Sequence, residues 1–90
     1  SLPTISMFYG IIVFMFSFDD KKHHVPHIHI NYAEYNASIS ITSGNIIAGN
    51  FPKKKLKLVQ AWIEIHRDEL NALWKLAIQG ESLYKIEPLK

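Results

Sequence analysis

The hydrophobic positions of the chain change their period near residue 50. Before that point, apolar and polar residues alternate over His27–Tyr32 and again over Tyr35–Thr42, as in half-buried strands. After it, apolar residues recur every three or four positions, as on one face of an amphipathic helix. The pattern predicts one domain over residues 1–90, with a strand-rich part over 1–50, a helical part over 51–80 and a C-terminal tail over 81–90.

The two alternating segments predict a hairpin with a defined register. A two-residue turn at Ala33 and Glu34 pairs Tyr32 with Tyr35, Ile30 with Ala37, and Ile28 with Ile39. The opposite face then carries only polar residues: His27, His29, Asn31, Asn36, Ser38 and Ser40. A slip of one residue would mix the two faces, so the register has support beyond strand propensity. Its weak point is Ala33, because such tight turns favour glycine.

Two further strands complete the predicted sheet. The segment Ile11–Phe18 is apolar at nearly every position, which indicates a strand whose two faces are both covered. A short fourth strand at Ile46–Ala48 follows the turn at residues 43–45. Residues 5–18 lack a basic flank and are shorter than the roughly 20 residues of a membrane span. We therefore interpret them as strand and expect a cytoplasmic protein without membrane contact.

The second half predicts one long helix between Pro52 and Gly80. Its apolar stripe comprises Leu56, Val59, Ile63, His66, Leu70, Leu73 and Ala77, flanked by Trp62 and Trp74. Unbroken, this helix is about 42 Å long, whereas a 90-residue domain has a radius of gyration of only about 12 Å. Either the helix breaks at residues 66–69, where Asp68 caps a second segment, or another subunit covers the overhang. We favour the second, because no glycine or proline interrupts the stripe.

These elements predict an α+β fold: an antiparallel meander of three to four strands with the C-terminal helix packed on one face. The tryptophans are then core residues or dimer anchors, and His66 is a hydrogen-bonded core histidine. The long helix and the strand that is apolar on both faces together predict a homodimer or a complex with a second protein.

The amino-acid composition limits the kinds of functional site that the chain can form. Apolar residues make up 48% of the 90 residues and charged residues 20%, as in a globular protein. The net charge of +2 permits contact with phosphates without requiring it. The absence of cysteine excludes disulfides, thiolate nucleophiles and cysteine-ligated zinc.

Four of the five histidines lie close together, at His23, His24, His27 and His29. Imidazole serves as a metal ligand, a general base or a general acid near neutral pH. Side chains two residues apart on a strand lie about 6.5 to 7 Å apart at the backbone, so His27 and His29 can meet one ligand. The cluster is therefore the first candidate site.

Three interpretations of this cluster remain open. His27 and His29 chelate a divalent metal, with His23 or Glu34 as third ligand. Alternatively, they act as acid and base on a phosphodiester, or they are surface residues hydrogen-bonded to serines of the next strand. A cupin barrel needs a longer chain. We expect no essential metal and no other cofactor, because regular structure holds only His27 and His29 together.

A lysine cluster opens the predicted helix, at Lys53, Lys54, Lys55 and Lys57. Exposed cations there oppose the helix dipole by about 0.3 to 1 kcal/mol each, so another interaction should favour them. The cluster forms either a phosphate-binding patch with the helix N–H groups or a solvated polar face.

Several separate motifs together resemble one bacterial family. They are Pro3-Thr4-Ile5-Ser6, Phe8-Tyr9-Gly10-Ile11, Pro26-His27-Ile28-His29, Tyr32 with Glu34-Tyr35, Ala61-Trp62, His66-Arg67-Asp68-Glu69-Leu70, Trp74, Gly80-Glu81 and Ile86-Glu87-Pro88-Leu89. The chain resembles a family of domains of unknown function that includes DhiT-like toxins of type II toxin–antitoxin modules. Its signature, His-x-Pro-Pro-His-x-His, maps onto residues 23–29, with Val25 in place of the first proline and Ala33 where a turn glycine is common.

The resemblance implies a toxin with a small cognate antitoxin protein. The first functional hypothesis is a toxin that acts on nucleic acid, with RNA as the expected target. His27, His29, His23 and Glu34 are its catalytic residues, and the lysine cluster holds phosphates. The second is a non-catalytic interaction or dimerisation module, or a small metal-binding protein. Because the alternation places His27 and His29 away from the helix, we expect either alanine substitution to leave the core intact.

Overall fold

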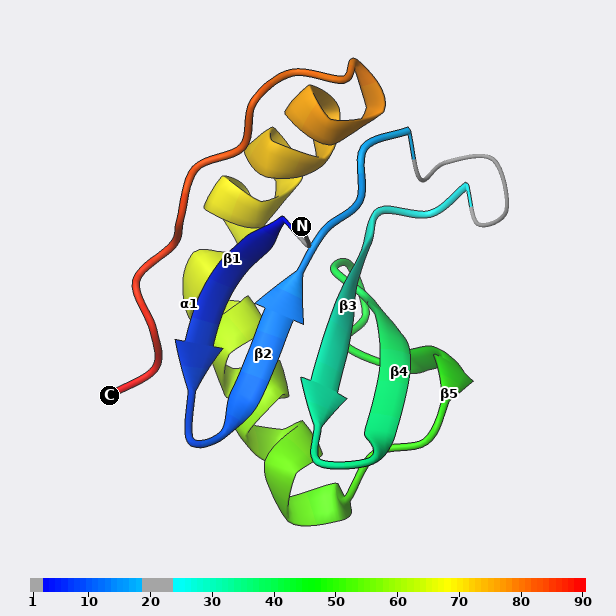
Figure 1. Cartoon of the computed structure of the whole chain (residues 1–90), viewed down its shortest axis with the longest axis vertical. Coiled ribbons are helices and arrows are strands. Elements are labelled where there is room, and N and C mark those ends of the chain that lie inside the picture. The colour runs from blue at the N-terminus through cyan, green and yellow to red at the C-terminus, as the bar shows by residue number, and fades with distance from the viewer. Residues whose placement is uncertain (1–2, 19–23) are drawn as a thin grey trace.

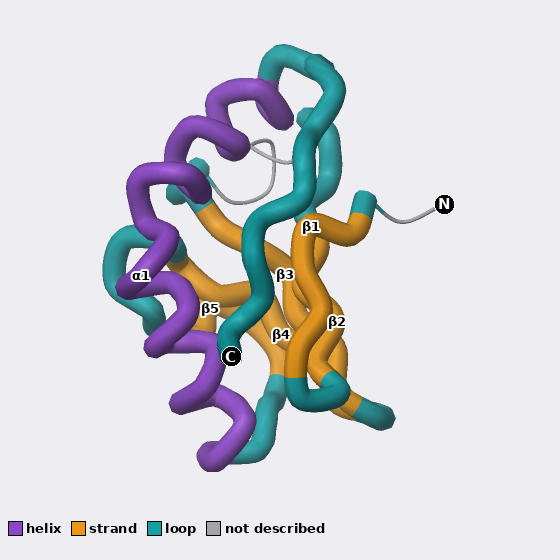
Figure 2. Tube along the Cα trace, turned by 90° about the vertical axis from the view of Figure 1, so that its left-hand side faces the viewer, coloured by secondary structure: helices purple, strands orange, loops and turns teal. Residues whose placement is uncertain are grey.

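The protein is a two-layer α+β structure, described by a computed structural model over residues 3–18 and 24–90. Five antiparallel strands lie in sequence order: β1 (Thr4–Phe8), β2 (Ile11–Phe14), β3 (His27–Tyr32), β4 (Tyr35–Ser40) and β5 (Ile46–Gly49) (Figure 1). One helix, α1 (Lys53–Ile78), lies against one side of this sheet (Figure 2). The predicted class and the position of the helix are confirmed. The sheet has five strands rather than three or four.

The additional strand is β1, which forms a hairpin with β2 through Tyr9 and Gly10. Both turn residues have positive φ angles, 51° and 80°, as a type I′ turn requires. Phe8 pairs with Ile11 across this turn. The apolar side chains on both sides conceal the turn in the sequence, so residues 5–18 read as one continuous strand. The Tyr-Gly pair was the signal that divides them.

The β3–β4 hairpin has the predicted register. Tyr32 lies opposite Tyr35, and the pairs continue through Ile30 with Ala37 and Ile28 with Ile39. Ala33 occupies the turn with a φ of 53°, in the left-handed region that favours glycine. The strand ends differ slightly from prediction, since β2 ends at residue 14 and β4 at residue 40, while β5 extends to residue 49.

Replacing Ala33 by glycine should stabilise the fold. A residue with a side chain costs about 1 to 2 kcal/mol in the left-handed region, and glycine avoids this cost. Part of the resulting gain is lost, because glycine also increases the entropy of the unfolded chain. We expect a net increase of about 0.5 kcal/mol in the free energy of unfolding, measured by urea denaturation. The matched control is Ala61→Gly on the exposed side of α1, which should lose about 1 kcal/mol. Equal losses in both variants would contradict the strained turn.

The core lies between the sheet and α1. Fully buried aliphatic side chains from β2, β3 and β4 meet those of the helix, including Val59, Ile63, Leu70 and Leu73. Both tryptophans belong to this core, as predicted: Trp62 is completely buried and Trp74 nearly so. The rings of Phe8 and Trp62 lie 5.4 Å apart between β1 and the helix. The apolar stripe of the helix therefore faces the sheet.

The helix bends at His66, so the prediction of an uninterrupted helix is wrong. His66 has non-helical dihedral angles, with φ at −112° and ψ at 21°. Its Nδ1 lies 2.7 Å from the carboxylate of Glu69, three residues into the second segment. Arg67 donates from Nε to the carbonyl of Ile41, which ties the bend to the end of β4. The residue at the break is thus His66 rather than Asp68.

The bend allows the helix to follow its own sheet. The molecule measures 33 Å along its longest axis, less than the straight helix would need. The helix therefore needs no second subunit to cover an overhang. On the surface beside the bend, a hydrogen bond and charge from Arg67 hold the pKa of the Glu64 carboxyl below its usual value. No helix among the described residues combines the length and the apolar content needed to cross a membrane.

The C-terminal tail, residues 81–90, completes one edge of the fold. The helix ends in a Schellman motif, in which Gly80 and Glu81 donate to the carbonyls of Ala77 and Leu76. The tail then runs back between α1 and β1 (Figure 2). The Ile86 N–H donates to the Ile5 carbonyl at 2.8 Å, and the Trp62 indole donates to the Glu87 carbonyl at 2.8 Å.

Candidate functional site

The sheet face opposite α1 carries a row of side chains that comes from four neighbouring strands. Phe14 of β2 pairs with His29 of β3, which pairs with Ser38 of β4, which pairs with Ala48 of β5. Because directly paired residues point to the same side of a sheet, these four side chains share the face. The pairing register therefore builds the site.

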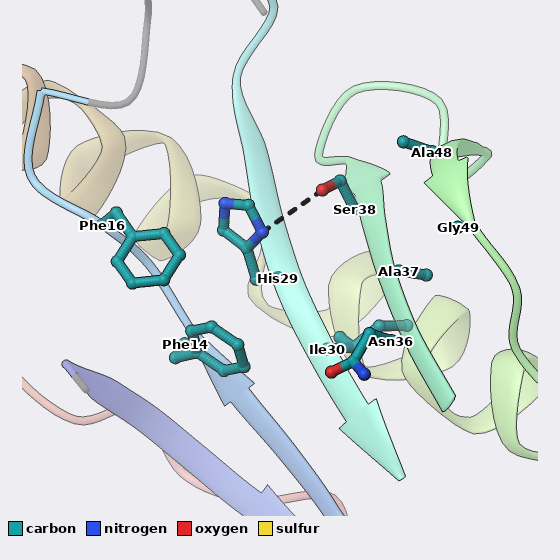
Figure 3. Close-up of a pocket in the computed structure, with 9 residues that line it drawn as sticks. All are labelled: Phe14, Phe16, His29, Ile30, Asn36, Ala37, Ser38, Ala48 and Gly49. Atoms are coloured by element: carbon teal, nitrogen blue, oxygen red, sulfur yellow. Dashed lines mark hydrogen bonds between the residues drawn. The ribbon is translucent and has the colours of Figure 1, made fainter. Parts of the chain in front are cut away.

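A groove of about 330 Å³ follows this row (Figure 3). Phe14, Phe16 and His29 line one side, and Ala48 and Gly49 line the other. Gly49 has a φ of 88°, and a Cβ there would lie 2.2 Å from the Asn36 carbonyl oxygen. Only glycine allows this close approach of β5 to β4, so the wall on this side has no large side chain.

His29 is half-buried in the groove and held from several sides. Its Nδ1 lies 3.2 Å from the Ser38 hydroxyl. Its ring is nearly parallel to that of Phe14, with 5.6 Å between centroids and 19° between planes, and meets the edge of Phe16 at 4.7 Å. A positioned imidazole in an open groove can donate or accept a proton.

His27 differs from the prediction, because it is completely buried. Its Nδ1 lies 2.8 Å from the Val25 carbonyl, which can only accept, so Nδ1 carries a proton. The ring packs 5.0 Å from Trp74 of α1 and 5.2 Å from His29. Strand alternation and the pairing with Ser40 group His27 with His29, but at this first residue of β3 the ring contacts Trp74 of α1 and is not exposed. His27 is therefore part of the packed interior, and its ring contacts that of His29.

Alanine at His27 should destabilise the fold strongly, contrary to the expectation from sequence. The change removes a fully buried ring and leaves the Val25 carbonyl without this donor, at a combined cost of about 2 to 4 kcal/mol. Alanine at half-buried His29 should cost about 1 kcal/mol. Urea denaturation of both variants makes the comparison. Similar midpoints for the two would contradict the buried position of His27.

Glu34, another predicted catalytic residue, is not among the residues that line this groove. Glu34 is exposed in the turn after β3. Tyr32, the last residue of β3, lies three residues beyond His29, about 10 Å at about 3.3 Å per residue, and Glu34 follows it in the turn. His23 lies outside the described residues. Within 3–18 and 24–90, no three histidine, aspartate or glutamate side chains gather as metal ligands.

The lysine cluster lies on the helix layer rather than on the groove face (Figure 2). Lys53, Lys54 and Lys57 are exposed in the first turns of α1. Lys55 is held in place instead: its Nζ donates to the Tyr9 carbonyl at 3.0 Å and lies 4.7 Å from the centre of the Tyr32 ring. The structure thus separates the lysines from His29, although the sequence analysis had grouped them.

Sequence reasoning did not identify the aromatic side of the groove. The segment that holds Phe14 and Phe16 is predicted as a strand with both faces covered, and a contact of either ring with His29 is not part of that prediction. The available signal was the apolar character of the second face of this strand, combined with the order of the strands. Pairing of the Ile11–Phe18 segment with the histidine strand would have placed Phe14 beside His29.

The fold and site define a small α+β protein with one sheet face left open by its helix. A family model described as a domain of unknown function, DUF4160, matches residues 10–75. Because this match covers well over half of the chain, the protein belongs to the DUF4160 family. No curated protein and no solved structure matches the chain. The family description assigns no activity, so functional inference rests on the site.

Proposed function

We propose that the protein is the toxin of a cytoplasmic type II toxin–antitoxin module and that it acts on RNA through the open face of its sheet. The observation that supports this proposal is the position of His29, an imidazole set in an open groove against the rings of Phe14 and Phe16. Aromatic side chains on a sheet face stack on unpaired bases, as in single-stranded RNA recognition. The resemblance of the sequence motifs to DhiT-like toxins provides the biological context.

In this proposal His29 is the general base. It takes the proton from a ribose 2′-hydroxyl as that oxygen forms a bond to the adjacent phosphorus. The bond from phosphorus to the 5′-oxygen breaks, and the leaving oxygen takes a proton from water. The Ser38 hydroxyl orients the ring through Nδ1. Buried His27 does not reach the substrate and acts only by packing behind His29.

The lysine cluster binds phosphates of the same strand away from the groove. Lys53, Lys54 and Lys57 surround the start of α1, which has no side-chain cap and no acidic residue in its first turn. Free N–H groups and cations at a helix N-terminus suit phosphate oxygens. The cluster therefore supplies affinity that depends on salt, while the groove supplies the reactive group.

The substitution His29→Asn tests the reaction. Asparagine keeps a polar atom near the position of Nδ1 for the bond to Ser38, but it does not titrate near neutral pH. We expect growth arrest after induction to be lost and cleavage of RNA in cell extract to fall by about 10² to 10⁴-fold. His24→Asn is the matched control, because His24 is exposed outside the groove, and it should arrest growth like the parent.

Two results would overturn this function. One is a parent protein that neither arrests growth nor cleaves RNA when expressed without its neighbouring gene. The other is a His29→Asn variant that folds like the parent and remains fully toxic.

A second function, protein binding, is favoured by the apolar patch beside the groove. Ile12 of β2 is half-buried on the open face and pairs with Met7 of β1, which is 60% exposed. Ile12 lies two residues before Phe14 on β2 and so shares the face of the groove, and its partner Met7 points to the same side. The patch suits a cognate antitoxin protein, which would cover the groove as it binds. A homodimer formed through the same patch is the other outcome of the experiment.

The substitution Ile12→Asp should weaken that complex by at least tenfold, because it places a charge in an apolar contact. The measurement is co-purification and light scattering of the protein with and without the product of the neighbouring gene. Ile65→Asp is the control, since Ile65 is 66% exposed on the helix layer. If Ile65→Asp disrupts the complex and Ile12→Asp does not, the partner binds the helix and the patch has no such role.

A further inference from the structure

We propose that the groove holds one unpaired base of the RNA strand and that Asn36 selects a base with a carbonyl group on its edge. This inference rests on the function proposed above and specifies its substrate: single-stranded RNA with uracil, cytosine or guanine at one position. Adenine has no carbonyl group and should be disfavoured there.

The size and shape of the groove suit a flat ring. A volume of about 330 Å³ lies at the lower end of the usual range for small-ligand pockets, about 300 to 1,000 Å³. Ser38, Ala48 and Gly49 leave the β4–β5 side low, while Phe14, Phe16 and His29 provide ring surfaces on the β2–β3 side (Figure 3). A base can enter from the open side and stack against Phe16.

The chemistry of the lining distinguishes a base from a phosphate. No lysine or arginine of the described residues lines the groove, and its polar side chains are the neutral amide of Asn36, the hydroxyl of Ser38 and the imidazole of His29. A phosphate bound in the groove would have no cationic side chain to compensate its charge. A base needs only stacking and neutral hydrogen bonds.

The orientation of the Asn36 amide determines which base edge it can recognise. The Asn31 side-chain nitrogen lies 3.2 Å from the Tyr35 carbonyl and 2.9 Å from Asn36 Oδ1. Because a carbonyl only accepts, Asn31 must present its NH₂ group here, and Asn36 must present its oxygen in return. Figure 3 shows both polar atoms of Asn36 over β3, with the amide nitrogen toward the C-terminal end of that strand. Asn36 lines the groove and its oxygen accepts from Asn31, so we assign the amide N–H as the group that Asn36 offers to a ligand.

The substitution Asn36→Asp separates the two ends of this amide. Aspartate keeps the oxygen that Asn31 needs but replaces the N–H donor by an acceptor. Fluorescence anisotropy should show that the parent binds a five-residue oligouridine at least tenfold more tightly than oligoadenosine, and that Asn36→Asp removes this preference. Asn71→Asp is the control for charge, because it adds the same charge on α1, and it should bind oligouridine like the parent.

A second variant tests the stacking. Phe16→Ala should weaken binding of oligouridine by about tenfold, and Phe16→Tyr should restore most of it. Equal binding of the two oligonucleotides, or no effect of Asn36→Asp and Phe16→Ala in folded protein, would overturn the base site.

These results are distinct from a failure of the proposed function. If toxicity depends on His29 but the protein shows no base preference, the proposed function stands and the base site is wrong. If the protein binds oligouridine selectively but is neither toxic nor able to cleave RNA, the base site is supported and the proposed toxin function is wrong.

Discussion

The site depends on the pairing of β3 with β4. With Tyr32 opposite Tyr35, the isoleucines of both strands face the helix, and His29 lies opposite Ser38 on the other side. A slip by one residue would turn the isoleucines to solvent and the histidines into the core, at a cost of several buried aliphatic side chains. The hydrophobic core therefore maintains the position of the candidate reactive group, although the two lie on opposite faces of the sheet.

Burial distinguishes the two histidines of β3 more than their sequence positions do. Both point to the same side, yet Trp74 covers His27, while His29 lies in the groove. This arrangement gives one imidazole a structural role and leaves the other for chemistry. His27 in turn contacts the ring of His29, so the packing of the helix end and the orientation of the groove imidazole are coupled through two rings.

The sequence predicted those features that depend on local pattern. Alternation was sufficient for the β3–β4 register, and Gly80 correctly marked the end of the helix. Alternation was not sufficient to predict the burial of His27, because Trp74, which contacts its ring, is distant in the sequence. The bend at His66 was missed for a similar reason: it involves a hydrogen bond from Arg67 to the carbonyl of Ile41, just after β4, and no proline or glycine marks it. Long-range contacts thus account for both errors.

The family match omits two segments that contact each other in the fold. It begins at residue 10, after β1, and ends at residue 75, before the C-terminal tail. The Ile86 N–H donates to the Ile5 carbonyl, and the tail supplies the acceptor for the Trp62 indole. A protein cut to the matched residues would expose the edge of β2 and leave a buried indole without its acceptor. Unpaired strand edges recruit other chains, so the matched region alone would tend to aggregate rather than behave as an independent folding unit.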